Sequence, residues 1–429
     1  MYDHAYIILG IVVAVFLIAK ALRLSTELSM LASAIAAAAY HGAVWSGEVP
    51  IRHLVEGTFT YFDVCLIFIS ATFFMALVKE SGGVAFIVRR IVGAFRTQRV
   101  ICLLLLTLVM LIPGALTGSG ATSVLTVGAL VGSVLTAMGV DDTRKTAALF
   151  MTAAMSAAAP PINLWAMMAA AGANMPYIGF KGPLAVLSIS GALFSMFWLA
   201  GRGGAPVDEN VMERLPQPPE RMNWLRVLTP FVVFTALLLA GRVRPFDFPI
   251  LGLPMIFMIS AFVVWLLSPV KLAVWDILTQ TVRNLLPLVG IMVVVGALIQ
   301  VLALSGARGV ISLRVVVLPL EVLFATLFII LPVSEGILQY AVAPLLGVPL
   351  IMLFNMKGMD VIVALSAMSV LWPIGDCLPP TAVVGRASVM ELDYKGRYFV
   401  VACLVPMAFV AICCTLFLVY SKQLAFLTL

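Results

Sequence analysis

Two acidic side chains lie inside apolar stretches of the sequence. Glu335 follows a run of Leu, Ile and Phe, and Asp376 precedes the pair Pro379–Pro380. An ionisable group inside a membrane is costly, so its presence there indicates a functional site. Carboxylate oxygens can complete a site for a hard cation such as Na⁺, or they can carry a coupling proton. A position of Glu335 at the water interface is the alternative.

A neutral polar stretch interrupts another apolar run, between Pro113 and Ser123. Proline removes a backbone donor and glycine relaxes helical geometry, so the helix should break here. Non-helical backbone at membrane depth is tolerated only when it is buried in protein or lines a cavity. The stretch therefore predicts the tip of a re-entrant hairpin at a binding site. A short loop outside the membrane is the alternative interpretation.

Two further breaks are marked by Pro160–Pro161 and Pro379–Pro380. Adjacent prolines cannot both sit within a continuous helix, so each pair should expose the ends of two half-helices, whose dipoles attract ions. A hairpin tip and a broken span from each half of the chain would form a substrate site near the bilayer midplane, whereas the alternative is a pair of kinked packing helices. The predicted binding residues are Thr117, Gly118, Ser119, Gly120, Thr122, Ser123, Ser156, Pro160, Pro161, Asn163, Ser334, Glu335, Gly336, Asp376, Pro379, Pro380 and Thr381. Among them, the predicted Na⁺ ligands are Ser119, Asn163, Glu335 and Asp376.

The composition is that of a polytopic integral membrane protein. Of 429 residues, 63% are hydrophobic and only 11% are charged, and the mean hydropathy is +1.14. Soluble domains carry roughly 25% charged residues. The net charge of +6 does not indicate nucleic-acid binding, because the basic residues lie between apolar spans. The six cysteines and three histidines show no metal-ligand spacing, so no cofactor is expected beyond the coupling ion.

An internal repeat emerges when the first half of the chain is laid over the second with Pro113 on Pro332. In this register Gly128 matches Gly347, Gly139 matches Gly358, Asp141 matches Asp360, and Pro160–Pro161 matches Pro379–Pro380. Each half would cross the membrane five times, and an odd number inverts the second half relative to the first. An excess of Lys and Arg on one predicted side supports an inverted arrangement.

The predicted fold is therefore all-α, with two inverted repeats of about five transmembrane helices and one re-entrant hairpin each. The first repeat covers 1–201, with its hairpin at 100–139 and its broken helix at 146–171. A cytoplasmic linker covers 202–223. The second repeat covers 224–429, with its hairpin at 319–358 and its broken helix at 361–385.

The motifs resemble those of a known family. Gly118-Ser-Gly-Ala, the later Gly139 and a following Pro-Pro resemble the large membrane subunit of the TRAP (tripartite ATP-independent periplasmic) transporters, in the ion-transporter superfamily. The resemblance implies an elevator-type, sodium-coupled importer of a small organic anion such as a dicarboxylate. It also implies a small membrane subunit, a periplasmic substrate-binding protein, and a bacterial or archaeal cytoplasmic (inner) membrane. The family usually has an aspartate near the second hairpin tip, where this sequence has Glu335.

Three other functions are alternatives to this importer. The first is a stand-alone sodium- or proton-coupled anion carrier of the same superfamily without a binding protein. The second is an intramembrane aspartyl protease, because Gly375-Asp376 approaches the Gly-x-Gly-Asp motif, but no convincing second aspartate lies at comparable depth and no HExxH or Gly-x-Ser-x-Gly is present. The third is a channel, which fits poorly because no ring of like charges is apparent. The sequence favours a transporter and not an enzyme.

Overall fold

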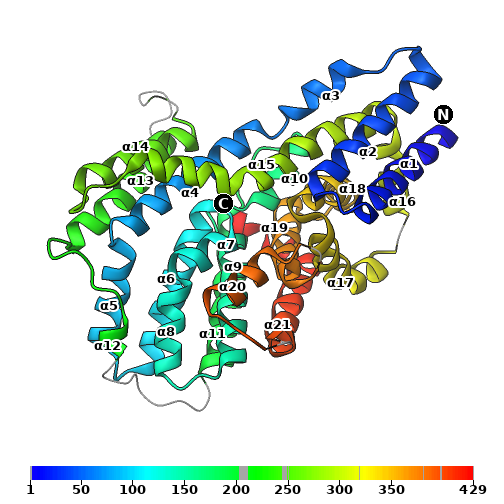
Figure 1. Ribbon diagram of the computed structural model, residues 1–429. Coiled ribbons are helices and arrows are strands. Elements are labelled where there is room, and N and C mark those ends of the chain that lie inside the picture. Colours follow the sequence, from blue (N-terminus) through cyan, green and yellow to red (C-terminus); the bar gives the residue numbers. More distant parts are fainter. Residues whose placement is uncertain are drawn as a thin grey trace.

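The computed structural model is helical throughout the part of the chain that it describes (Figure 1). It describes residues 2–201, 211–243, 249, 251–317, 319–379, 381–396 and 399–428. Within these ranges, ten helices are long and apolar enough to cross a membrane. The predicted polytopic helical membrane protein is confirmed at this level.

The chain begins with four helices, of which the second contacts the first and the third. They are α1 (Tyr2–Ala21), α2 (Thr26–His41), which continues as a π-helical turn (Gly42–Ser46), α3 (Ile51–Thr58) and α4 (Phe62–Glu80). The long α15 (Val274–Leu304) lies against α2, α3 and α4 (Figure 1). This helix is 31 residues long. Its first turns carry Asp276 and Arg283, which lower the hydropathy without opposing a helix.

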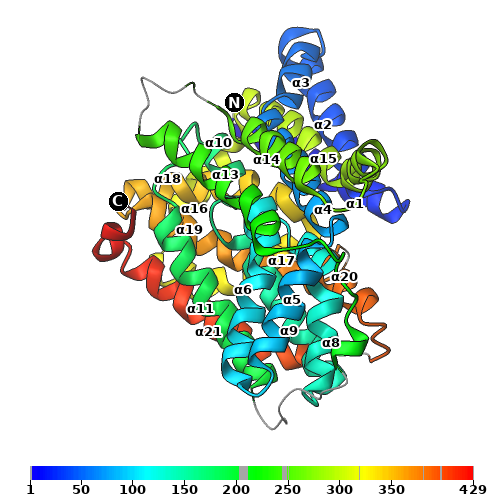
Figure 2. The same ribbon diagram turned by 90° about the vertical axis from the view of Figure 1, so that its left-hand side faces the viewer.

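The first predicted hairpin is a helix–turn–helix unit. Its first arm is α6 (Arg99–Thr117), and its second arm runs through α7 (Gly120–Ser123) and a π-helical turn (Val124–Gly128) into α8 (Ala129–Ala137). Gly118 makes the turn with φ +71°, a conformation that glycine adopts without a steric penalty. The short amphipathic helix α5 (Gly83–Phe95) packs beside α6 and α8 (Figure 2).

The first broken helix follows. It consists of α9 (Asp142–Ala158), a non-helical segment, and α10 (Leu164–Gly172). Every residue of α9 from Lys145 to Ala158 is buried, as expected for a helix packed on all sides. Its neighbours include α6, α11 (Lys181–Ala200) and α21 (Phe399–Val419).

The second half also contains a helix–turn–helix unit and a broken helix. After α12 (Val211–Arg214), α13 (Trp224–Val243), α14 (Leu253–Leu267), α15 and α16 (Ala307–Val316) comes a second helix–turn–helix unit. Its arms are α17 (Leu320–Leu338), and a 3-10 turn (Gln339–Ala341) with a π-helical turn (Ala343–Gly347) leading into α18 (Val348–Met356). The second broken helix comprises α19 (Val361–Leu371), a 3-10 segment (Trp372–Cys377) and α20 (Val383–Glu391), and the chain then enters α21 and a last 3-10 turn (Gln423–Thr428).

Local irregularities recur in the register that places Pro113 on Pro332. The π-helical turns Val124–Gly128 and Ala343–Gly347 occupy matching positions, and so do α8 and α18. Each arm ends at a glycine of positive φ, Gly139 or Gly358. The next helix is then capped by Asp141, which accepts from the backbone N–H of Thr143 at 3.0 Å, or by Asp360, which accepts from Val363 at 2.9 Å. The matched residues thus mark matched local structure.

Candidate functional site

The two hairpin turns and the two helix breaks lie around one group of buried polar side chains. Ser119 and Asn163 come from the first half, and Glu335 and Asp376 from the second. They are 3%, 0%, 1% and 4% exposed, respectively. Glu335 therefore does not lie at the water interface, which was the alternative drawn from the sequence.

Glu335 is held by an aromatic side chain from the other half. The indole Nε1–H of Trp165, in α10, donates to Oε2 of Glu335 at 2.8 Å. A hydrogen bond to a carboxylate is stronger than one between neutral groups. This contact links the second hairpin to the helix that follows the first break.

Asp376 is the least satisfied group of the site. The backbone N–H of Val383, at the start of α20, lies near its carboxylate. Its Oδ1 atom, however, is buried and has no hydrogen-bond partner. It also lies close enough to Glu335 for the two carboxyl groups to interact electrostatically. Within the described part of the chain, the ion pairs involve neither group.

Tyr340 connects the two hairpin turns. Its hydroxyl donates to the carbonyl oxygen of Gly118 at 3.3 Å and also neighbours the Ser119 side chain. Its ring packs on Trp165, with centroids 4.7 Å apart. Tyr340 therefore contacts the first turn, and it packs on Trp165, the same residue that donates a hydrogen bond to Glu335.

The turn before Tyr340 is made without glycine. Gln339 has φ +52° and ψ −143°, a combination that residues with a Cβ rarely adopt. In the first hairpin, Gly118 follows α6 as Gln339 follows α17. The second turn is thus strained at a residue with a Cβ, whereas the first turn uses glycine.

The breaks are joined to each other and to the turns by buried hydrogen bonds. The Asn163 amide Nδ2 donates to Ser369 Oγ, in α19, at 3.1 Å, while its Oδ1 caps α10 by accepting from the Ala166 N–H at 2.9 Å. In the second half, the hydroxyl of Thr381 donates to the carbonyl of Gly336 at 2.9 Å. Each break therefore has a fixed geometry and does not behave as a free loop.

Ser123 and Ser156 have their hydrogen bonds committed to packing. The Ser123 hydroxyl accepts from the Gly114 N–H at 2.9 Å and donates to the Met110 carbonyl at 2.8 Å, across the position of Pro113. The Ser156 hydroxyl contacts Ser123 at 2.9 Å and the carbonyl of Ala153 at 2.6 Å. These two residues hold α9 against the hairpin, and their role in ligand binding stays a prediction.

The remaining predicted residues fall into three groups. Thr117 and Ser334 bond to carbonyls of their own helices, Pro113 and Leu331, and Thr122 donates its backbone N–H to the Ser119 hydroxyl. Gly120 and Gly336 are close-packing positions, where an added Cβ would lie 2.7 Å from the Ala153 carbonyl oxygen and from Leu378 Cβ, respectively. Pro160 and Pro161, joined by a cis bond, are half-buried and face a different space, Pro379 is exposed, and Pro380 lies outside the described residues.

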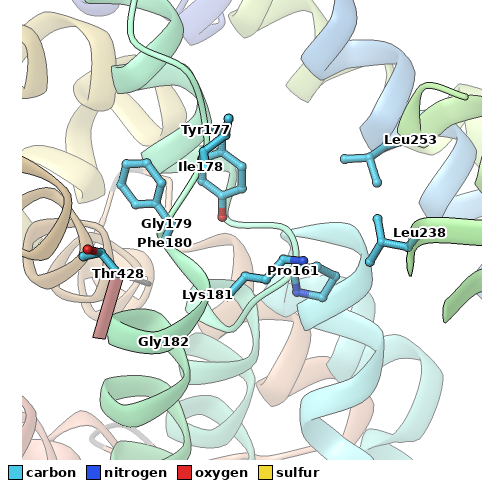
Figure 3. A pocket seen from close by; sticks show the side chains of 10 residues that line it. All are labelled: Pro161, Tyr177, Ile178, Gly179, Phe180, Lys181, Gly182, Leu238, Leu253 and Thr428. Atoms are coloured by element: carbon cyan, nitrogen blue, oxygen red, sulfur yellow. The ribbon is translucent and has the colours of Figure 1, made fainter. Parts of the chain in front are cut away.

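A cavity of about 350 Å³ lies beside the first break (Figure 3). Pro161 and Tyr177 line it together with the backbone at the start of α11 and side chains of α13 and α14. Figure 3 shows the Tyr177 ring and Pro161 facing the same space. This cavity contains none of the four predicted ion ligands, so it is distinct from the polar group described above.

Sequence reasoning missed Trp165, Tyr340 and Ser369. Trp165 and Tyr340 read as ordinary apolar residues of a membrane span, and Ser369 as a small packing residue. A usable signal existed for the two aromatic residues, since buried Tyr and Trp usually find a hydrogen-bond partner and these follow the first break and the second turn directly.

We expect the substitution Tyr340→Phe to reduce transport several-fold while leaving the protein folded. The ring would keep its packing on Trp165, and only the bond to Gly118 and the contact with Ser119 would be lost, at a cost of about 1 kcal/mol. Initial transport rates in proteoliposomes and the unfolding temperature in detergent measure the two effects. Unchanged transport would show that Tyr340 is not part of the site. A large drop in unfolding temperature would show that its role is structural.

Comparison with known proteins identifies the architecture. No protein-family model and no curated protein matches the sequence. Among solved structures, Neisseria gonorrhoeae MtrF, described with a class of antimetabolite efflux pumps, aligns with a TM-score of 0.63 at 15% identity, over 86% of this chain and 83% of its own. The Alcanivorax borkumensis YdaH transporter aligns with a TM-score of 0.61 at 13% identity, over 87% of this chain and 89% of its own.

These alignments bear on the family named from the motifs. The two neighbours are transporters outside the TRAP family, so the TRAP resemblance is not supported. At such low identities the likeness concerns the fold alone. The chain has the fold of these two membrane transporters.

Proposed function

We propose that the protein is a secondary active transporter that moves a small organic anion by coupling it to a cation gradient. The observation that carries this proposal is the buried Asp376 carboxylate, with one oxygen unpartnered, beside the buried carboxylate of Glu335. The fold shared with two transporters supports the general class.

The electrostatics favour a cation at this place. Two carboxylates taken out of water are expensive unless a positive charge compensates them. No described ion pair supplies that charge, and the hydrogen bond from Trp165 neutralises only part of it. A transported Na⁺ or proton would complete the site, and neutral oxygens such as that of Ser119 could contribute.

The coupling ion in this proposal is Na⁺, held by Glu335 and Asp376 with Ser119 and Asn163 from the other half. Asn163 already uses its amide to join the two breaks, so its contribution would come from its backbone or from a rearranged side chain. The organic anion would bind at the half-helix ends next to the cation. This preference for an anion rests on the motif resemblance.

Inverted repeats and an elevator movement belong to the same proposal. The recurrence of both π-helical turns and both aspartate caps at matching positions of the two halves supports a repeat. The two halves would then expose one site alternately to either side of a bacterial or archaeal cytoplasmic membrane. A small membrane subunit and a periplasmic binding protein remain predictions from the resemblance.

Proteoliposomes with independently imposed sodium and proton gradients test the proposal. A panel of radiolabelled mono- and dicarboxylates should include at least one that accumulates when Na⁺ is directed inward and fails to accumulate without a gradient. Accumulation driven by the proton gradient alone would show that the coupling ion is H⁺ and not Na⁺. Equilibration of solutes without accumulation under either gradient would contradict active transport and favour a passive pore.

Export is the second candidate, because MtrF is described with efflux pumps. The same proteoliposomes decide between the two directions. An exporter that works by antiport would accumulate substrate inside the vesicles when the cation gradient is directed outward, because cation and substrate move in opposite directions. An importer would require both to move in the same direction.

A further inference from the structure

A second polar pocket lies away from the transport site, between α5 and the segment that precedes α13. Its volume is about 700 Å³. Arg89 and Arg90 line it from α5, and Gln217 and Glu220 line it from the facing segment. It shares no residue with the group around Asp376, so the proposed function does not explain it.

The wall of this pocket is a fixed structure. Arg89 Nη1 donates to the carbonyl oxygens of Met212 and Leu215, both at 2.7 Å. Leu215 is 2% exposed, so the facing segment is anchored against the helix. An arginine has five N–H donors, and these two bonds use only Nη1. Its remaining donors can serve a ligand without releasing the segment.

Arg90 supplies the exposed positive charge. Its guanidinium carbon lies 5.2 Å from the centroid of the Phe86 ring, a cation–π arrangement that orients the side chain over the pocket. Phe86 in turn meets the edge of Trp224, with centroids 5.3 Å apart and an angle of 78° between the rings. Against the two arginines, Glu220 contributes one carboxylate, which leaves the pocket positive.

The pocket lies where membrane spans end. The candidate span of α4 ends at Glu80, just before α5, and the candidate span of α13 begins at Trp224, just after the facing segment. With 13 residues, α5 is too short to cross a bilayer and is not among the candidate spans. Tryptophan at the end of a span is typical of the lipid headgroup region. The positive pocket is therefore at the level of the lipid phosphates.

We propose that this pocket binds the phosphate of an anionic phospholipid headgroup through Arg89 and Arg90. Guanidinium groups pair with phosphate through directed, charge-assisted hydrogen bonds. The lipid would join α5 and the start of α13, and so stabilise the folded protein when bound. Glu220 would oppose binding and limit affinity.

Thermal unfolding of the full-length protein in detergent tests the proposal. The protein is titrated with short-chain phosphatidylglycerol, with phosphatidylcholine of equal chain length, and with inorganic phosphate. We expect phosphatidylglycerol to raise the unfolding temperature of the wild type most. In Arg90→Gln the midpoint of this titration should move to about tenfold higher lipid concentration, and in Glu220→Gln to a lower one.

The matched control is Arg144→Gln, which removes an exposed arginine outside the pocket. Its titration should follow the wild type. An equal effect of Arg144→Gln and Arg90→Gln would overturn the site, because general surface charge would then explain the response. An equal response to both lipids, or a full response to inorganic phosphate alone, would overturn the assignment to an anionic lipid. If Arg90→Gln lowers the unfolding temperature without lipid, native mass spectrometry of retained phosphatidylglycerol replaces the thermal readout, and unchanged retention would reject the proposal.

Discussion

The variant Asp376→Asn is expected to lose cation-coupled transport while remaining folded. Asparagine keeps the size of the side chain and removes a charge from a buried place in which one oxygen has no partner. If Asp376 binds the cation directly, its replacement should lower the apparent cation affinity roughly tenfold or more. The affinity for the anion should then fall only through linkage between the two sites. Transport at varied Na⁺ and fixed substrate, in proteoliposomes, measures the first effect, and substrate titration at saturating Na⁺ measures the second.

Stability distinguishes this role from a structural one. Replacing an uncompensated buried charge by a neutral group removes a desolvation penalty, so the unfolding temperature of Asp376→Asn should equal or exceed that of the wild type. Glu335→Gln should behave alike in transport, although it weakens the bond from Trp165. The control is Glu321→Gln, an exposed acid on the same helix as Glu335, which should leave cation dependence unchanged. Wild-type ion dependence in Asp376→Asn would exclude it as a ligand.

The variant Gly375→Ala should severely destabilise the second half. An added Cβ at Gly375 would lie 1.9 Å from the carbonyl oxygen of Pro332, which belongs to the backbone of α17 and cannot rotate away. Overpacking typically costs about 1–3 kcal/mol, and a contact with backbone belongs at the upper end. Because Asp376 is the next residue, transport should fail together with folding. A large loss of monodisperse protein and of unfolding temperature would show this.

Gly10→Ala is the matched control. It makes the same substitution in α1, where an added Cβ would meet nothing within 4 Å. It should be neutral or slightly stabilising, because alanine favours a helix by about 1 kcal/mol over glycine. If Gly375→Ala is as stable as Gly10→Ala, the close packing of α17 on the second break is wrong.

Most of the secondary structure could be predicted because membrane burial imposes strong local rules. Apolar runs predicted the spans, and Gly118 and Pro160–Pro161 predicted a turn and a break, since these residues act on their own backbone. Pro113 was expected to break its helix, but α6 continues through it to Thr117. Asp141 and Asp360, which the sequence showed only as matched positions, cap the helices that follow them.

The site could be predicted only in part, because its side chains meet across the two halves. Nothing near Trp165 in the sequence shows that its indole reaches Glu335, 170 residues away. Ser123 was predicted as a binding residue from its type and position, and nothing in the sequence showed that its hydroxyl also bridges the Met110 and Gly114 backbone groups beside Pro113. Residue type indicates what a group can bind, and the fold decides what it contacts.

The non-glycine turn at Gln339 has a thermodynamic consequence. A residue held in such a sparsely populated conformation stores about 1 kcal/mol or more, which the rest of the structure must supply. Any rearrangement of the second turn that lets Gln339 relax recovers that free energy, and so raises the population of the rearranged state roughly fivefold relative to an unstrained turn. Gly118 stores no such energy in the first turn. The second turn, next to Tyr340, is therefore the strained one, and we expect it to move before the first turn.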